Sequence, residues 1–118
     1  MESIIFLPTE DLGRTKAFYE GVLGLDLRLD QGTCHIYRIT GAAHIGFCTG
    51  LKSISPADSV IVTIVADNVD EIHARLVQQG VQVDDMPRVN EKFKIYHFFA
   101  KDPNGYRVEV QSFLDPRW

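Results

Sequence analysis

Residues 11–25 read DLGRTKAFYEGVLGL, a segment typical of a short helix with a defined beginning and end. Thr9 and Asp11 offer side-chain oxygens that can cap the first turn, and Gly24 suits the left-handed residue that ends a helix. Phe18 and Val22 lie four positions apart, so they place an apolar stripe on one side of the helix. A one-sided stripe predicts a helix that packs on a sheet.

The same pattern returns in the second half of the chain. Asp11 precedes Gly24 by 13 residues, and Asp67 precedes Gly80 by the same interval. The apolar residues between Asp67 and Gly80 recur at helical spacing, which predicts a second amphipathic helix. An internal duplication is the natural explanation, although two matching pairs could also arise by chance.

Runs typical of strands flank both predicted helices. The expected strands cover residues 3–7, 25–29, 34–39 and 44–48 in the first half, and 60–65, 81–84, 94–100 and 106–111 in the second. Asp102-Pro103-Asn104-Gly105 predicts the last hairpin turn, because proline fixes φ and glycine allows a positive φ. Each half therefore predicts βαβββ. We expect one α+β domain over residues 1–118, with module one at about 1–50 and module two at about 58–113.

Two segments resemble the motifs of a known superfamily. The segment 11–25 resembles the first-motif signature of the vicinal oxygen chelate superfamily of glyoxalases, bleomycin resistance proteins and extradiol dioxygenases. Residues 102–109, DPNGYRVE, are similar to its second-motif ending. The resemblance covers essentially the whole chain and implies two βαβββ modules that form a curved mixed sheet around a cavity, usually in a homodimer. Because the family includes metal-dependent isomerases, ring-cleaving enzymes and antibiotic-sequestering proteins, the fold alone does not define the function.

The resemblance also implies four metal-ligand positions, of which this chain keeps one. Three of them fall at Ile4, Gly46 and Ile61, whose side chains cannot bind a metal, and only Glu109 carries a donor. A divalent cation needs several nitrogen or oxygen donors, so we expect no metal and no other cofactor. His44 lies two residues before Gly46, on the same face of its strand, and keeps open a divalent metal held by Glu109 and His44.

The face that the resemblance turns toward the cavity is apolar with a few polar side chains, which is the usual composition of a small-molecule site. Its expected members are Ile4, Phe6, His44, Gly46, Cys48, Ile61, Thr63, Arg107 and Glu109. Glu109 is the candidate catalytic residue, as a general acid or base, and Arg107 on the same strand face is a candidate ligand contact beside it. The alternative is that both merely form the solvated face of a strand.

The other histidines allow more than one interpretation. His97 shares a strand face with Phe99, and the two are candidate ligand contacts, although a hydrogen-bonded core histidine is the more common outcome. His35 and Tyr37 also share a face, and the sequence does not decide whether that face or the opposite one lines the cleft. His73 lies on the amphipathic second helix and is expected at the surface.

Cys34 and Cys48 are the only cysteines in the chain. They are too few for the disulfide framework of a secreted protein and lack the spacing of a structural zinc site, so we expect reduced thiols. The two positions are equidistant from residue 41 and could face each other across a hairpin. Small core side chains are the default interpretation, and a catalytic thiol is the alternative.

Composition excludes several kinds of partner. The formal net charge is −4 and the isoelectric point is near 5.5, so nothing attracts the chain generally to nucleic acid or to anionic membranes. The N-terminal residues MESIIFLPTED lack the pattern of a signal peptide, and no apolar run is long enough to span a bilayer. The expected partner is a small organic molecule, and the expected compartment is the cytoplasm.

These observations favour a small-molecule binding protein of the glyoxalase or bleomycin-resistance type that works without the family metal. The alternative is an enzyme of the same superfamily, a lyase, isomerase or dioxygenase, that uses Glu109 as acid, base or metal ligand. A third interpretation is an interaction module with a vestigial cavity. No phosphate-binding loop and no GxSxG motif supports nucleotide chemistry or serine hydrolysis.

Overall fold

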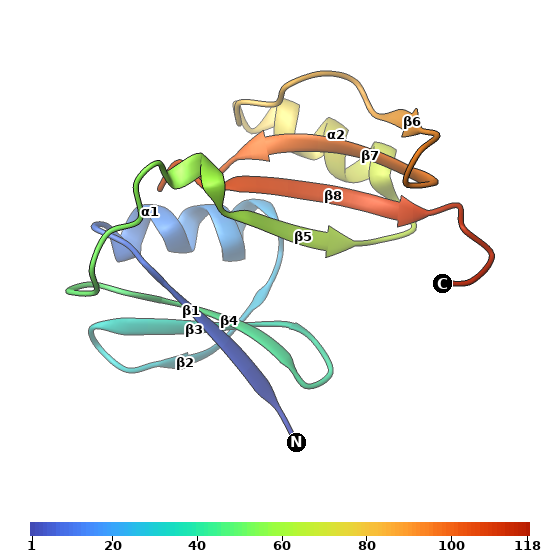
Figure 1. Ribbon diagram of the computed structural model, residues 1–118. Coiled ribbons are helices and arrows are strands. Elements are labelled where there is room, and N and C mark those ends of the chain that lie inside the picture. Colours follow the sequence, from blue (N-terminus) through green and yellow to red (C-terminus); the bar gives the residue numbers. More distant parts are fainter. The chain divides into compact units, whose positions relative to one another are not determined.

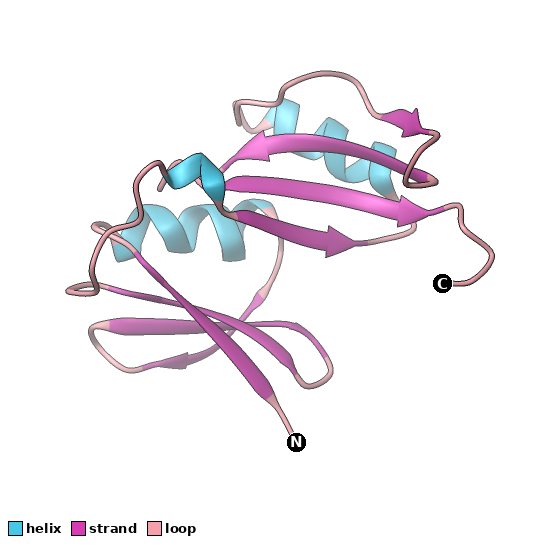
Figure 2. Ribbon diagram, viewed as in Figure 1, coloured by secondary structure: helices cyan, strands magenta, loops and turns pink.

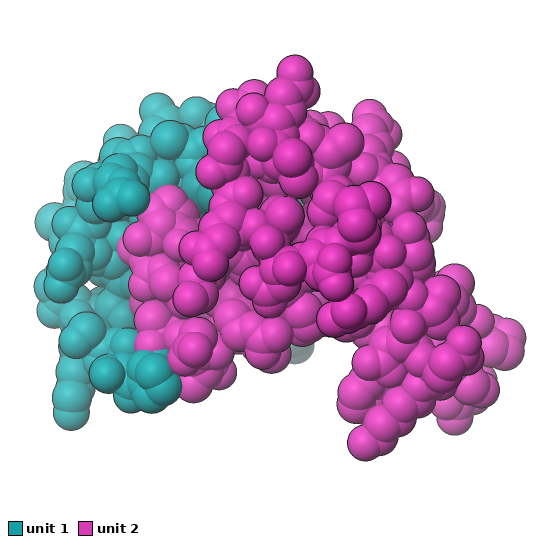
Figure 3. Space-filling view, turned by 90° about the horizontal axis from the view of Figure 1, so that it is seen from above, with its two compact units in different colours: residues 1–56 teal, residues 57–118 magenta.

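The computed structural model describes residues 1–118, and the chain divides into two units, Met1–Pro56 and Ala57–Trp118 (Figure 3). Each unit consists of a four-stranded mixed sheet with helices. Figure 2 distinguishes strands, helices and loops by colour. The predicted α+β class with two βαβββ modules is confirmed. No helix is both long and apolar enough to span a membrane.

The first unit begins with a strand and a helix and continues with three strands (Figure 1). Its elements are β1 (Ser3–Pro8), α1 (Leu12–Lys16), the π-helical turn η1 (Ala17–Val22), β2 (Asp26–Asp30), β3 (Cys34–Thr40) and β4 (Ala43–Cys48). The strand order is β1-β4-β3-β2; β1 runs parallel to β4, and the other neighbours are antiparallel.

The second unit repeats this plan. Its elements are the 3-10 turn η2 (Ala57–Ser59), β5 (Ile61–Val65), α2 (Val69–Gln78), β6 (Arg88–Asn90), β7 (Ile95–Lys101) and β8 (Arg107–Phe113). The strand order β5-β8-β7-β6 repeats the order of the first unit position by position, again with one parallel pair, β5 with β8. The repeated topology supports the internal duplication.

The signals that bounded the helices in the sequence have their expected geometry. The Asp11 side chain accepts a hydrogen bond from the Arg14 backbone N–H at 2.9 Å, which satisfies one of the free donors of the first turn. Gly24 and Gly80 have φ values of 75° and 76°, a left-handed conformation that residues with a Cβ rarely adopt. The shared interval of 13 residues thus separates corresponding positions of two repeated modules.

In each unit one face of the sheet packs on the helix. In the first unit Tyr19 of η1 lies against Phe47 and Tyr37, with ring centroids 4.5 and 6.0 Å away. In the second unit Leu76 and Val69 of α2 are buried, together with the alternate residues of β7 and β8 on that side of the sheet. The opposite face of each sheet carries no helix, and we call it the helix-free face.

Two predictions in the second unit were wrong. Residues 81–84 do not form a strand, because Val83 makes only an isolated bridge to Ala100. The strand that pairs with β7 at this edge of the sheet is β6 instead. His73 is buried rather than at the surface. It lies four residues after Val69 and therefore on the same face of α2, where its Nε2 lies 3.1 Å from the Asp85 carbonyl.

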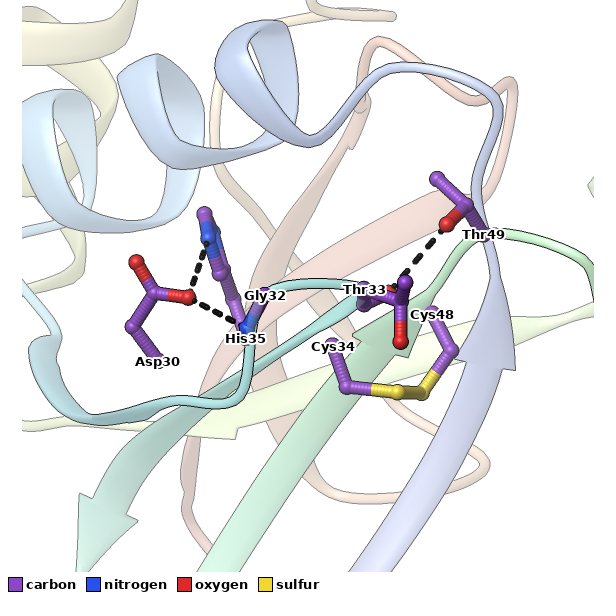
Figure 4. The surroundings of a disulfide bond; sticks show 7 residues. All are labelled: Asp30, Gly32, Thr33, Cys34, His35, Cys48 and Thr49. Carbon is purple, nitrogen blue, oxygen red and sulfur yellow. Dashed lines mark hydrogen bonds and ion pairs between the residues drawn. A yellow bond between two sulfur atoms is a disulfide. The ribbon is translucent and has the colours of Figure 1, made fainter.

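The reduced-thiol prediction was also wrong, because Cys34 and Cys48 form a disulfide (Figure 4). The two residues are direct partners in the antiparallel register of β3 and β4, as their equal distance from residue 41 allowed. Beside the disulfide, the Thr49 hydroxyl donates to the Thr33 carbonyl at 3.3 Å. The number of cysteines does not determine whether two of them meet, whereas the register of β3 and β4 places this pair side by side.

Candidate functional site

The helix-free face of the second sheet gathers six of the predicted site residues. Thr63 on β5 pairs with Glu109 on β8, which in turn pairs with Phe99 on β7. Since side chains alternate along a strand, residues two positions away share this face. The face therefore carries Ile61, Thr63, His97, Phe99, Arg107 and Glu109.

Glu109 is the centre of a hydrogen-bonded network on this face. Its Oε1 accepts from the Thr63 hydroxyl at 3.0 Å, and its Oε2 lies 2.8 Å from Nδ1 of His97. The side chains of Glu109 and His97 are each only 12% exposed, so little water competes for this contact. Hydrogen bonds to an ionised partner are shorter and stronger than neutral ones. The network fixes the carboxylate and the imidazole relative to each other.

Arg107 lies beside this network and makes a different contact. Its guanidinium carbon lies 3.9 Å from the centroid of the Phe99 ring, a cation–π arrangement. The Phe99 ring in turn meets the His97 ring edge to face, with centroids 5.4 Å apart. Glu109 therefore pairs with His97 and not with Arg107, and the guanidinium has no hydrogen bond or ion pair with another side chain.

A cavity of about 320 Å³ opens beside these residues within the second unit. Its walls include His97, Phe99 and Arg107 together with the segment 84–90. Arg88 of this segment is held by Asp85, whose Oδ2 lies 3.0 Å from Nη1. Arg107 also borders a second hollow of about 340 Å³, beside Asp84 and Lys101. The row of His97, Phe99 and Arg107 thus presents a ring surface, a cation and an imidazole to open space.

The helix-free face of the first sheet carries the other predicted site residues. Phe6, His44 and Cys48 lie on it, as does Gly46, because Phe6 pairs with Gly46 and His44 lies two residues earlier on β4. His44 is buried, and its Nδ1 lies 3.3 Å from the Ser3 carbonyl oxygen. Cys48 is bound in the disulfide and has no free thiol.

The face on which His35 lies, left open by the sequence, is the helix side of the first sheet. Tyr37 lies on the same side, and its hydroxyl is buried without a hydrogen-bond partner. Burial raises the pKa of Tyr37 to about 12, and the charges of Glu20 and Asp30 add to the shift. These two residues therefore belong to the interior of the first unit, and Arg38 lies on the helix-free face.

Comparison with known proteins identifies the family. The model of the glyoxalase/bleomycin resistance protein/dioxygenase superfamily matches residues 3–110. The chain belongs to this superfamily. A comparison with curated proteins found no match.

Several solved structures have the same fold. TnmS3, an antibiotic binding protein from Streptomyces sp. CB03234, is 22% identical with a TM-score of 0.81 over 95% of this chain and 94% of that one. A glyoxalase/bleomycin resistance protein/dioxygenase from Nocardioides is 16% identical, with a TM-score of 0.79 over 98% and 85%. A glyoxalase/bleomycin resistance protein from Albidiferax ferrireducens T118 is 21% identical, with a TM-score of 0.74 over 93% and 96%. At these identities the likeness concerns the fold.

The residues of this superfamily member do not fit the metal of its metal-dependent relatives. At Gly46 the Phe6 ring covers the Cα, and a Cβ built there would lie 2.5 Å from two ring carbons, so a longer ligating side chain has no room. Both oxygens of Glu109 already accept hydrogen bonds from protein side chains. No group of three or more His, Cys, Asp or Glu side chains is placed to hold a metal ion.

Sequence reasoning missed two features of this site. It placed His97 and Glu109 on candidate faces but did not pair them, because the register between β7 and β8 depends on the length of the turn between them. It also missed the segment 84–90 as a cavity wall. No periodic signal marks this segment, and Pro87, which lacks an N–H, is its one clear indication of irregular backbone.

Proposed function

We propose that this protein binds a small, partly aromatic organic molecule against the helix-free face of its second sheet, without a metal ion. One observation carries the proposal. The Arg107 guanidinium, stacked on Phe99 at 3.9 Å and free of any ion pair, borders a cavity of about 320 Å³ beside His97. The volume of this cavity lies at the low end of the range of roughly 300–1,000 Å³ that is usual for ligand sites.

The chemistry of this row favours a flat ligand. Phe99 covers one face of the guanidinium, and the second face and the N–H edge can stack on an aromatic ring or donate to an oxygen. Aromatic side chains at such sites supply contact area at a small cost in conformational entropy. TnmS3, which shares the fold, is described as an antibiotic binding protein, so a sequestering role is compatible with this architecture.

The network around Glu109 favours binding over the enzymatic alternative. A general acid or base must come within hydrogen-bond reach of the group with which it exchanges a proton. Each carboxylate oxygen of Glu109 already has a hydrogen-bond partner within the protein, Thr63 for one and His97 for the other. We therefore assign Glu109 the role of a positioning residue that fixes the His97 ring beside the cavity.

The test is a thermal-shift screen of aromatic compounds, followed by titration calorimetry of the compounds that raise the melting temperature. Phe99→Ala should weaken binding at least tenfold, because it removes both the ring surface and the support of Arg107. Phe93→Ala is the matched control, since Phe93 also carries a cation, Lys92 at 5.3 Å, but is exposed on the hairpin between β6 and β7. Equal loss in both variants, or in neither, contradicts the proposal.

Metal independence is part of the proposal. Protein purified without a chelator should hold far less than one equivalent of zinc, nickel, manganese, iron or cobalt by elemental analysis. A stoichiometric metal whose occupancy falls in both Glu109→Ala and His44→Ala would contradict this and restore the two-residue metal site.

A homodimer remains our prediction for the assembly, from the family resemblance. Sedimentation at micromolar concentration should give twice the monomer mass of 13.3 kDa. A monomer mass alone over that range of concentration contradicts it.

The compartment also remains a prediction. The acidic composition and the N-terminal sequence indicate the cytoplasm, whereas a disulfide such as Cys34–Cys48 is more usual in oxidising compartments. Thiol labelling of the protein in intact cells distinguishes the two, since a cytoplasmic protein should be labelled at both cysteines.

A further inference from the structure

The four histidines of the chain differ in the environment of Nε2. His73 Nε2 lies 3.1 Å from the Asp85 carbonyl, and His35 Nε2 lies 3.4 Å from a carboxylate oxygen of Asp30. His44 is buried with its Nε2 3.9 Å from Glu2. His97 alone uses only Nδ1, toward Glu109, and its Nε2 has no partner in the protein. His97 is also among the residues that line the cavity of about 320 Å³, so a ligand there would lie beside this residue.

The network determines what that free nitrogen offers. An ionised carboxylate can only accept hydrogen bonds, so the contact of 2.8 Å between Glu109 and Nδ1 of His97 requires the proton to be on Nδ1. In neutral imidazole the other nitrogen then carries a lone pair and acts as an acceptor. Thr63 donates to the other carboxylate oxygen at 3.0 Å, which helps to hold the arrangement in place.

We propose that Nε2 of His97 is the specificity-determining hydrogen-bond acceptor of the cavity, and that the ligand class is a hydroxylated aromatic carboxylate or carbonyl compound. The inference rests on the proposed binding function and names its ligand chemistry. The ligand hydroxyl donates to Nε2, and the ligand carboxylate or carbonyl oxygen accepts from the Arg107 guanidinium, which has no acceptor in the protein. The aromatic ring between these groups lies along the row that His97, Phe99 and Arg107 form.

Specificity follows from the cost of leaving a polar group unpaired. A site built to receive a hydroxyl rejects the analogue that lacks it, because a desolvated acceptor then loses its partner. A methyl ether keeps the ring and the carboxylate and removes only the donor. The matched pair of hydroxyl and methyl ether therefore isolates the His97 contact from the stacking contact.

The experiment titrates wild-type protein with 3- and 4-hydroxybenzoate and with the corresponding methoxybenzoates, by ligand-observed NMR and calorimetry. One hydroxybenzoate should bind at least tenfold more tightly than its methyl ether. In His97→Phe, which keeps a ring and removes the acceptor, the preference should fall to about one. Circular dichroism and the melting temperature check that the variant is folded. The comparison of hydroxybenzoate with methoxybenzoate on wild-type protein does not depend on any variant.

The outcomes separate this inference from the function on which it rests. A preference near one in wild-type protein, or a preference that survives in His97→Phe, overturns the assignment of His97. If Phe99→Ala still weakens all the benzoates in that case, the binding site stands and only its specificity is wrong. If none of the benzoates binds, the ligand class is wrong, and the proposed site depends on the aromatic compounds of the screen. If benzoates bind but Phe99→Ala leaves their binding unaffected, this inference and the proposed site both fail.

Discussion

Replacing Glu109 by methionine removes the carboxylate at the centre of the network and keeps a side chain of similar length. Thr63 and Nδ1 of His97 then lose their common acceptor. Thr63 is exposed, so its hydroxyl can turn to water at little cost. His97 is 12% exposed and has few alternatives, so most of the cost comes from this residue.

The magnitude follows from these two contacts. A hydrogen bond to a charged group contributes roughly 1.5–3 kcal/mol, and the remaining access to water reduces that figure to about 1–2 kcal/mol for Glu109→Met. In a chain of this size about 1 kcal/mol corresponds to roughly 4 °C, so the melting temperature should fall by about 4–8 °C. Glu109→Gln should cost under about 1 kcal/mol, because the amide oxygen still accepts from His97 and the Thr63 hydroxyl can accept from the amide.

The assay is urea unfolding of the two variants and of wild-type protein, with Glu91→Met as the matched control on an exposed glutamate outside the network. The order of stability should be wild type, then Glu109→Gln, then Glu109→Met, with the control close to wild type. Nuclear magnetic resonance of the imidazole nitrogens of wild-type protein should show the proton on Nδ1 when the His97 ring is neutral. A stability of Glu109→Met equal to the control, or a proton on Nε2 instead, refutes the network as the element that orients His97.

Three further predictions concern the first unit. The pKa of Tyr37 is raised from 10.0 to about 12, so its contribution to stability is fully present below about pH 10 and is lost as the pH rises through 12. Tyr37→Phe should abolish this alkaline loss of stability in urea unfolding. Because the substitution also removes an unpaired buried hydroxyl, it should add about 1 kcal/mol to the free energy of unfolding at pH 7. Gly46→Ala should cost about 1–3 kcal/mol through its clash with the ring of Phe6, and a double-mutant cycle with Phe6→Ala should recover most of it; additive costs would show that the cost does not come from the Phe6 ring. Reduction of the Cys34–Cys48 bond, which spans a separation of 14 residues, should lower the free energy of unfolding by about 2–3 kcal/mol, and a stability insensitive to dithiothreitol would contradict this.

The sequence was informative about the fold because its signals were local. A one-sided apolar stripe and a terminal glycine with a positive φ mark each helix, Asp11 caps the first one, and alternation marks most strands. The exceptions are also physical. The strand expected at 81–84 fails because Val83 alone reaches Ala100, and β6 is only three residues long, which is too short for alternation to mark it.

The candidate site was less predictable because it depends on contacts between strands. Alternation correctly placed Arg107 and Glu109 on one face, but whether Glu109 meets Arg107, Thr63 or His97 depends on strand register and rotamer. The prediction of reduced thiols failed for the same reason, since the number of cysteines says nothing of strand register. The absence of metal-binding side chains at the family's ligand positions could be seen directly in the sequence, whereas the Phe6 ring over Gly46 was visible only in the structure.

The central claim is that the ligand of this protein lies against the row of His97, Phe99 and Arg107. A crystal structure of the protein with the tightest aromatic ligand from the screen tests it most directly. We expect ligand density stacked beside Arg107 and Phe99, an oxygen of the ligand within about 3.2 Å of Nε2 of His97 as hydrogen bonding requires, about one ligand per chain and no metal ion at Glu109. Ligand density elsewhere on the chain, or a metal ion bound to Glu109 between protein and ligand, would contradict it.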